Sequence, residues 1–197
     1  ERRVGNTFAK GETVSVGGSW IGERGFAGIA YTNRQDQYGL PGHSHEYESC
    51  TVSGNLLIGC GEEDYGDEHE TGPWVDLKSE RYDFRTEILN PLAGFEKLRA
   101  HASYTDYQHD EIEADSVATA FKSKGYDARL EMVHQPIADW EGVVGVQYNQ
   151  QKLDITGEES ILEPTKTQKW SVFGLEHKQW NDFHFELGSR VDHQTID

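Results

Sequence analysis

The sequence predicts an all-β protein, an antiparallel up-and-down meander of the kind that forms a transmembrane β-barrel. Apolar and polar residues alternate along many segments, so each predicted strand has one apolar and one polar face. Aromatic residues make up 11% of the chain and glycine is frequent at 21 residues, yet only 35% of residues are hydrophobic. This balance is expected where only one face of each strand is apolar.

The clearest alternation lies near the C-terminal end of the sequence. There Phe183, Phe185 and Leu187 alternate with His184 and Glu186. A strongly charged face opposite an apolar face does not suit the core of a soluble sandwich. It is typical of a wall between lipid and a wet lumen.

Four stripes of alternating apolar residues predict the strands of the first half. Val14 and Val16 belong to the first stripe, Ile29 and Tyr31 to the second, and Phe84 to the third. The fourth follows the same period of two. The predicted strands are 13–21, 26–38, 74–88 and 97–109.

The second half continues the pattern without any segment that requires a helix. The alternation is weakest around Tyr126 and clearer at Val144 and Val146, and Phe173 and Leu175 share a face. The predicted strands are 119–134, 142–153, 168–178 and 183–194.

The predicted connections alternate in length. Short turns on one side of a sheet and long loops on the other are typical of an outer-membrane meander, whose long loops face outward. The five tryptophans, at 20, 74, 140, 170 and 180, are expected near strand ends, as interface residues. The short turns are 22–25, 90–94, 136–139 and 179–182, and the long connections are 39–73, 110–117 and 156–167.

The chain is strongly acidic, with 35 Asp and Glu against 18 Lys and Arg and a formal net charge of -17. This charge repels nucleic acid and attracts cations, so we expect no nucleic-acid partner. No Gly-x-Ser-x-Gly, His-Glu-x-x-His or phosphate-loop motif is present, and we expect no enzymatic activity.

The connection 39–73 combines histidines with a dense set of carboxylates. His43, His45, Glu46 and His69 are candidate ligands, because neutral imidazole with carboxylate suits zinc. Two alternatives stay open. The segment can be a solvated acidic loop that binds nothing specifically, and calcium competes for sites made only of oxygen atoms.

The two cysteines of the chain, Cys50 and Cys60, lie in the same connection. Their spacing is not that of a zinc ribbon or finger, which favours a disulfide over a pair of thiolate metal ligands. A disulfide predicts an oxidising compartment.

Several ordered motifs from about residue 13 onward resemble one family. Residues 37–47, Gln-Tyr-Gly-Leu-Pro-Gly-His-Ser-His-Glu-Tyr, are similar to the signature segment of TonB-dependent outer-membrane zinc receptors of the ZnuD type. Further similar segments are 19–22, 34–38, 73–77, 95–99, 106–111, 134–137 and 146–152.

This resemblance implies a 22-stranded barrel with an N-terminal plug, of which residues 1–197 would form about eight strands, without the plug. It further implies a place in the bacterial outer membrane, in contact with membrane lipid and lipopolysaccharide. The function implied is capture and import of zinc ions as the transported ligand. The TonB complex would act through the plug that this chain lacks.

The resemblance also implies site residues. The barrel ligand of the family's zinc site falls on Glu111, with His109 and Asp110 beside it. The other ligands of that site belong to segments not present here. The connection 39–73 corresponds to the large extracellular loop that gathers zinc, although it keeps only three histidines and its second half is rich in glutamate.

Two other functions remain as alternatives. One is a stand-alone eight-stranded outer-membrane barrel with an adhesion or surface-structural role. The other is a soluble β-rich segment that buffers metal, against which the apolar strand faces argue.

Overall fold

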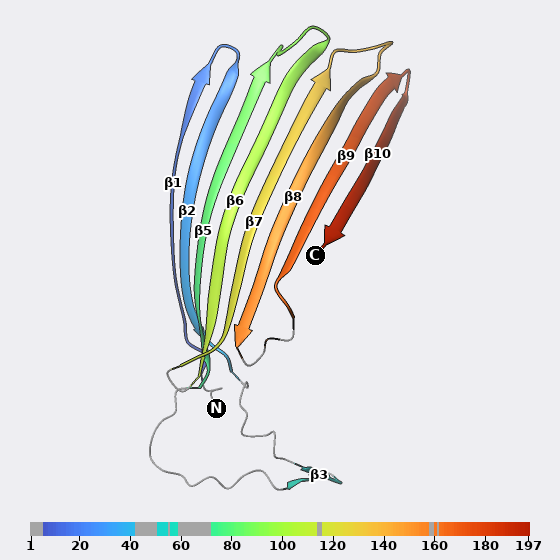
Figure 1. Ribbon diagram of the computed structural model, residues 1–197. Helices are drawn as coiled ribbons and strands as arrows, with labels where there is room; N and C mark the ends of the chain where they lie inside the picture. Colours follow the sequence, from blue (N-terminus) through green and yellow to red (C-terminus); the bar gives the residue numbers. More distant parts are fainter. Residues whose placement is uncertain are drawn as a thin grey trace.

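The computed structural model describes residues 6–41, 51–54, 56–58, 72–113, 116–157, 160 and 162–197. Eight long strands form one antiparallel sheet, and each pairs with the next long strand along the chain (Figure 1). The all-β, up-and-down prediction is confirmed. In order across the sheet the strands are β1 (Ala9–Gly22), β2 (Gly25–Gly39), β5 (Trp74–Leu89), β6 (Phe95–Glu113), β7 (Ser116–His134), β8 (Glu141–Gly157), β9 (Thr165–Trp180) and β10 (Phe183–Ile196).

None of the residues placed in the structure forms a helix of the length and apolar character needed to cross a membrane.

All eight predicted strands are present, but most run further toward the long loops than predicted. The connection expected at 110–117 is wrong, because β6 continues to Glu113 and β7 begins at Ser116, its pairing partner. The residues added at these ends mix polar side chains with single apolar ones such as Ile112, Val117 and Ile155. They therefore lack the alternation from which strands are predicted.

The connection 39–73 was expected to contain no strand, and this expectation is also wrong. A small hairpin of β3 (Thr51–Ser53) and β4 (Leu56–Ile58) lies within it, with Gly54 in its turn at a φ of 64°. The candidate residues that lie outside the described part of the chain are His43, His45, Glu46, Cys50, Cys60 and His69.

The predicted short turns are confirmed, and all lie at the opposite end of the sheet from Gly39, where β2 ends, and Trp74, where β5 begins (Figure 1). Their backbones use left-handed conformations. Asn90 and Asn181 have φ angles of 49° and 50°, which asparagine tolerates better than most residues. Gly25 has a φ of 139°, and a Cβ there would overlap the carbonyl oxygen of Glu87.

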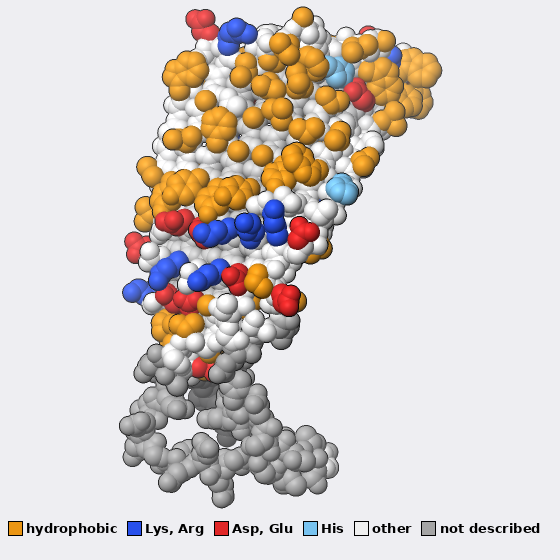
Figure 2. Space-filling model, in the orientation of Figure 1, with side chains coloured by type: hydrophobic (Ala, Val, Ile, Leu, Met, Phe, Trp, Pro, Cys, Tyr) orange, Lys and Arg blue, Asp and Glu red, His pale blue; other side chains and the backbone are white. Residues whose placement is uncertain are grey.

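The sheet is a single layer with two faces of different chemistry. One, here called the apolar face, carries residues such as Val16, Ile29 and Val172, all well exposed. Figure 2 shows hydrophobic side chains covering this face toward the short turns, and rows of charged side chains nearer the loops. The opposite, polar face carries most of the arginines. Phe173 and Leu175 do share a face, but it is the polar one, in register with Gly145 and Val143 of β8.

The sheet is open. β1 and β10 lie at opposite edges (Figure 1), and each pairs with only one strand. Both edge strands are fully described, and they do not pair with each other. In the part of the chain that the structure describes, the eight long strands therefore form an open sheet.

A β-bulge interrupts the pairing of β6 with β7 near the loops. Glu111 pairs with Thr119 and Ile112 with Val117, so Ala118 is an extra residue on β7. Gly157 of β8 lies against this point with a φ of 122°, and a Cβ there would overlap the carbonyl oxygen of Ala118. Bulges re-aim neighbouring side chains, and only glycine lets β8 approach this one.

We predict that Gly157→Ala lowers the free energy of unfolding by about 1–3 kcal/mol, because it combines a strained backbone with a steric overlap. The measurement is urea-induced unfolding in detergent micelles. Gly18→Ala is the matched control, since Gly18 has no heavy atom within 4 Å of where its Cβ would lie. If the two substitutions destabilise the chain equally, the bulge does not require glycine at position 157.

Candidate metal-binding site on the polar face

The structure separates the three adjacent candidate ligands of β6. His109 and Glu111 are two residues apart in a regular stretch of strand and therefore lie on the same, polar face. Asp110 lies on the apolar face, where its cross-strand partners are Asp76 and Ala120. Only two of the three predicted residues can contribute to one site.

His109 is held in a defined orientation. Its ring stacks on Phe121 of β7, with ring centroids 4.3 Å apart and an interplanar angle of 16°. Its Nδ1 lies 2.9 Å from the hydroxyl oxygen of Tyr107 on the same strand. Because the Nδ1 side is occupied, Nε2 is the nitrogen available to a ligand.

Burial lowers the pKa of His109 below its usual value, and the charge of Asp110 offsets only part of this shift. The imidazole is therefore neutral at a pH where an ordinary histidine would already be partly protonated. The neutral form is the one that binds a metal ion.

Glu111 lies at the most tightly packed place of the polar face. Its cross-strand partners are Val75, which is 2% exposed, and Thr119, which is fully buried. Glu111 itself is half-buried and directly precedes the bulge. Glu111 thus lies between two buried residues of the neighbouring strands.

Asp110 has partners of its own on the apolar face. The Gln108 amide nitrogen lies 3.1 and 3.0 Å from the two carboxylate oxygens of Asp110. Across the strand, Asp76 forms an ion pair with Lys78 at 3.1 Å. Among the residues that the structure describes, no three or more His, Cys, Asp or Glu side chains are grouped to hold a metal ion. His109 and Glu111 therefore form at most a partial site.

Below this site, the polar face carries ion pairs between residues two apart on one strand. Arg81 donates two hydrogen bonds to Asp83, at 2.7 and 2.8 Å. His101 of β6 lies 3.3 Å from Asp83 and 3.9 Å from Asp127 of β7. The signal for such pairs in the sequence is an arginine two positions from an acid, because residues two apart lie on the same face of a strand.

The same arrangement continues across β8, β9 and β10. Arg190 donates to Asp192 at 2.9 Å and to the Ser171 hydroxyl at 2.7 Å. Its guanidinium also faces the Phe173 ring, as does that of Arg129, 4.3 Å from the ring centroid. These contacts explain how an aromatic residue is accommodated on the polar face. The polar face is thus a hydrated wall with largely balanced charge.

The apolar face has a row of aromatic side chains at one level, here called the tyrosine row. Neighbouring rings contact one another, with centroids 4.9 Å apart for Tyr31 and Tyr82, 4.7 Å for Tyr104 and Tyr126, and 4.4 Å for Tyr148 and Trp170. The row consists of Tyr31, Tyr82, Tyr104, Tyr126, Tyr148 and Trp170.

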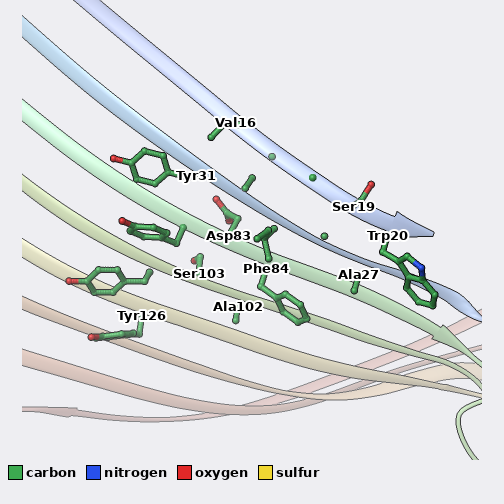
Figure 3. A pocket seen from close by; sticks show the side chains of 17 residues that line it. Val16, Ser19, Trp20, Ala27, Tyr31, Asp83, Phe84, Ala102, Ser103 and Tyr126 are labelled. Atoms are coloured by element: carbon green, nitrogen blue, oxygen red, sulfur yellow. The ribbon is translucent and has the colours of Figure 1, made fainter. Parts of the chain in front are cut away.

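The tyrosine hydroxyls point toward the loops. Tyr31 donates to Glu80 at 2.7 Å and Tyr148 to Gln150 at 3.0 Å. Tyr31, Tyr82, Tyr104 and Tyr126 line a shallow apolar hollow of about 960 Å³, and Figure 3 shows tyrosine rings side by side there with their hydroxyls on the same side. The row therefore marks the boundary between the apolar and the charged part of this face.

The tryptophans mostly lie where the sequence predicts them. Trp20 and Trp180 lie close to the short turns, Trp140 lies just before β8, and Trp74 begins β5 at the loop end. Trp170 is the exception, because it lies inside β9 as part of the tyrosine row.

The strand histidines divide between the faces. His101 and His177 lie on the polar face, within 3.3 Å of Asp83 and 3.4 Å of Glu141 respectively. His134 instead lies at the short-turn end of the apolar face and contacts Glu176 at 3.0 Å.

A search against models of known protein families finds none that matches this chain.

We predict that Tyr107→Phe weakens zinc binding at His109 by roughly 10-fold, as expected when the partner that orients a histidine ligand is lost. The ring remains to pack, so the sheet should stay folded. The measurement is calorimetric titration with zinc in detergent micelles, beside circular dichroism. Tyr104→Phe, in the tyrosine row of the other face, is the control. An unchanged affinity in Tyr107→Phe would show that zinc does not use this imidazole.

Proposed function

We propose that this chain is a segment of the barrel wall of a TonB-dependent outer-membrane receptor that captures and imports zinc. The observation that carries the proposal is the pair His109 and Glu111, which share the polar face and pair in register with the first residues of β5. A neutral imidazole and a carboxylate are a suitable half of a zinc site.

The membrane placement is supported by the dimensions of the apolar face. In β9, ten residue steps separate Trp170 of the tyrosine row from Trp180 at the short-turn end, roughly 33 Å along the strand. At the strand tilt of about 35–45° found in outer-membrane barrels, this length is roughly 25 Å of height. An outer-membrane barrel has an apolar band about 25 Å tall, bordered by aromatic residues at both interfaces. Among the residues that the structure describes, no other layer covers the exposed apolar side chains, and lipid would do so.

The two open edges support a segment of a larger wall. β1 and β10 each have 14 residues and a row of backbone groups without a strand partner. In lipid each unsatisfied backbone group is costly, so a spanning sheet must close. The closure would come from further strands, as in the 22-stranded barrel that the sequence resemblance implies. The stand-alone eight-stranded barrel is less well supported, because the edges do not meet.

Two ligands on the wall suit a site that zinc passes through. Zinc prefers four ligands, so His109 and Glu111 would hold it only with help from the plug. The acidic connection 39–73 would raise the local cation concentration above them. Movement inward would depend on a plug and on the TonB complex, as the sequence resemblance implies.

We predict that the chain in detergent micelles binds zinc with a Kd on the order of 10 µM, about -7 kcal/mol. Glu111→Ala should weaken binding at least tenfold, whereas Asp110→Ala should leave it unchanged. Both remove one carboxylate from adjacent positions, but only Glu111 shares a face with His109. Calorimetric titration measures the difference.

A His43→Ala/His45→Ala double variant tests the loop separately. If this variant loses affinity for zinc while Glu111→Ala binds zinc as tightly as the unaltered chain, capture takes place in the loop. Equal binding in all variants would refute a specific zinc site on this chain.

Val144 lies in the middle of the apolar band. We predict that Val144→Arg destabilises the chain folded in lipid vesicles, lowering its free energy of unfolding by about 2–4 kcal/mol. Asn149→Arg introduces the same charge on the polar face of β8 and should have a much smaller effect. Urea titration in phosphatidylcholine vesicles measures both. Equal effects would contradict the lipid-facing assignment.

A further inference from the structure

Two histidines lie close together on the polar face at the short-turn end, the opposite end of this face from the site described above. His177 is near the end of β9 and His184 near the start of β10, and their ring centroids are 5.8 Å apart. They are diagonal neighbours, because His177 pairs in register with Glu186 and His184 with Gln179. Diagonal side chains on one face of an antiparallel pair are within reach of each other.

A carboxylate lies beside this pair. Glu141, the first residue of β8, pairs in register with His177, and its Oε2 lies 3.4 Å from Nε2 of His177. Good N–H···O hydrogen bonds are shorter, with an upper limit of about 3.2 Å. Two ligands of one tetrahedral zinc ion, with bonds of about 2.1 Å, lie about 3.4 Å apart. The two atoms therefore lie at the spacing of metal ligands.

The separation of the two imidazole rings fits the same ion. Two rings that bind one tetrahedral zinc ion through nitrogen have centroids about 5.2 Å apart, and those of His177 and His184 are 5.8 Å apart. Nδ1 of His184 lies 3.4 Å from Oε1 of Gln179. Because the Nδ1 side is occupied, Nε2 of His184 is the nitrogen available to a metal ion.

A change of one exposed side chain would bring the ligands together. The structure groups no three such side chains around one point among the residues it describes. His177 and Glu141 already lie at ligand spacing, whereas His184 is exposed on the edge strand β10. Exposed side chains change rotamer within nanoseconds, so the ring of His184 can turn toward an ion held by the other two.

The neighbouring lysine does not compete for this carboxylate. Lys178 follows His177 in β9 and therefore lies on the other face of the sheet. Its ammonium group donates to the backbone carbonyl of Ala138 at 2.7 Å and lies 3.6 Å from Asp139. The carboxylate of Glu141 thus remains available to a cation on the polar face.

We infer that His177, His184 and Glu141 form a second metal-binding site, at the short-turn end of the polar face. Two imidazoles and one carboxylate suit zinc or a similar divalent transition metal, whereas magnesium and calcium prefer sites made of oxygen atoms. The inference goes beyond the proposed function, because it needs neither the membrane placement nor zinc binding at His109. The polar face then offers metal ligands at both of its ends.

The test is histidine footprinting on the full chain in detergent micelles, with zinc as the probe. Diethyl pyrocarbonate modifies free imidazole, and mass spectrometry reads each site separately, because trypsin cleaves between His177 and His184 at Lys178. At a zinc concentration about ten times the Kd, both histidines should react about 10-fold more slowly than without metal. Magnesium at the same concentration should protect neither.

Three variants test whether the ligands share one ion. Glu141→Gln should raise the Kd about tenfold, so that protection at the same zinc concentration falls to about twofold. Glu176→Gln is the matched control, since Glu176 adjoins His177 in sequence but lies on the apolar face. It should leave protection unchanged. His184→Gln should remove most of the protection of His177, because one ligand of the shared ion is lost.

The inference is overturned if zinc protects neither histidine, or if His177 stays fully protected in His184→Gln. Equal loss of protection in Glu141→Gln and Glu176→Gln would overturn it too, because net charge would then explain the effect. Failure of the proposed function gives a different result. Glu111→Ala, which removes a ligand of the first site, should leave the protection of His177 and His184 unchanged.

Discussion

The register of the cross-strand pairing is the constraint on which the rest of the structure depends. From β1 to β10 the strands pair with few shifts, so a residue that is apolar on one strand meets apolar neighbours on the next. A slip of one residue would exchange the two faces. The tyrosine row and the balanced ion pairs of the polar face both exist because this register is kept across the sheet.

The eight strands were predictable because apolar and polar environments alternate along them with a period of two. The prediction stopped short where that contrast ends. Beyond the tyrosine row both faces carry polar residues, so the extension of β6 to Glu113 left no pattern to recognise. The hairpin β3–β4 is too short to give a periodic signal. Whether β1 and β10 remain sheet edges depends on which strands pair with them, and the alternation of apolar and polar residues along one strand does not indicate its pairing partner.

The candidate site was partly predictable for the same reason. An offset of two residues places His109 and Glu111 on one strand face, and the same rule removes Asp110 from it. The stacking on Phe121 and the hydrogen bond between His109 and Tyr107 depend on pairing between strands and on rotamers. The bulge beside Glu111 depends on one unpaired residue, Ala118, and on a glycine 39 positions further along the chain.

The sequential order of the strands has a consequence for how the sheet forms. Most pairings join strands separated by a short turn, and closing a short turn costs little chain entropy. The pairing of β2 with β5 is different, because the segment from residue 40 to 73 must be closed first. Assembly should therefore proceed quickly through β5 to β10, with the β1–β2 hairpin joining as the last and slowest step.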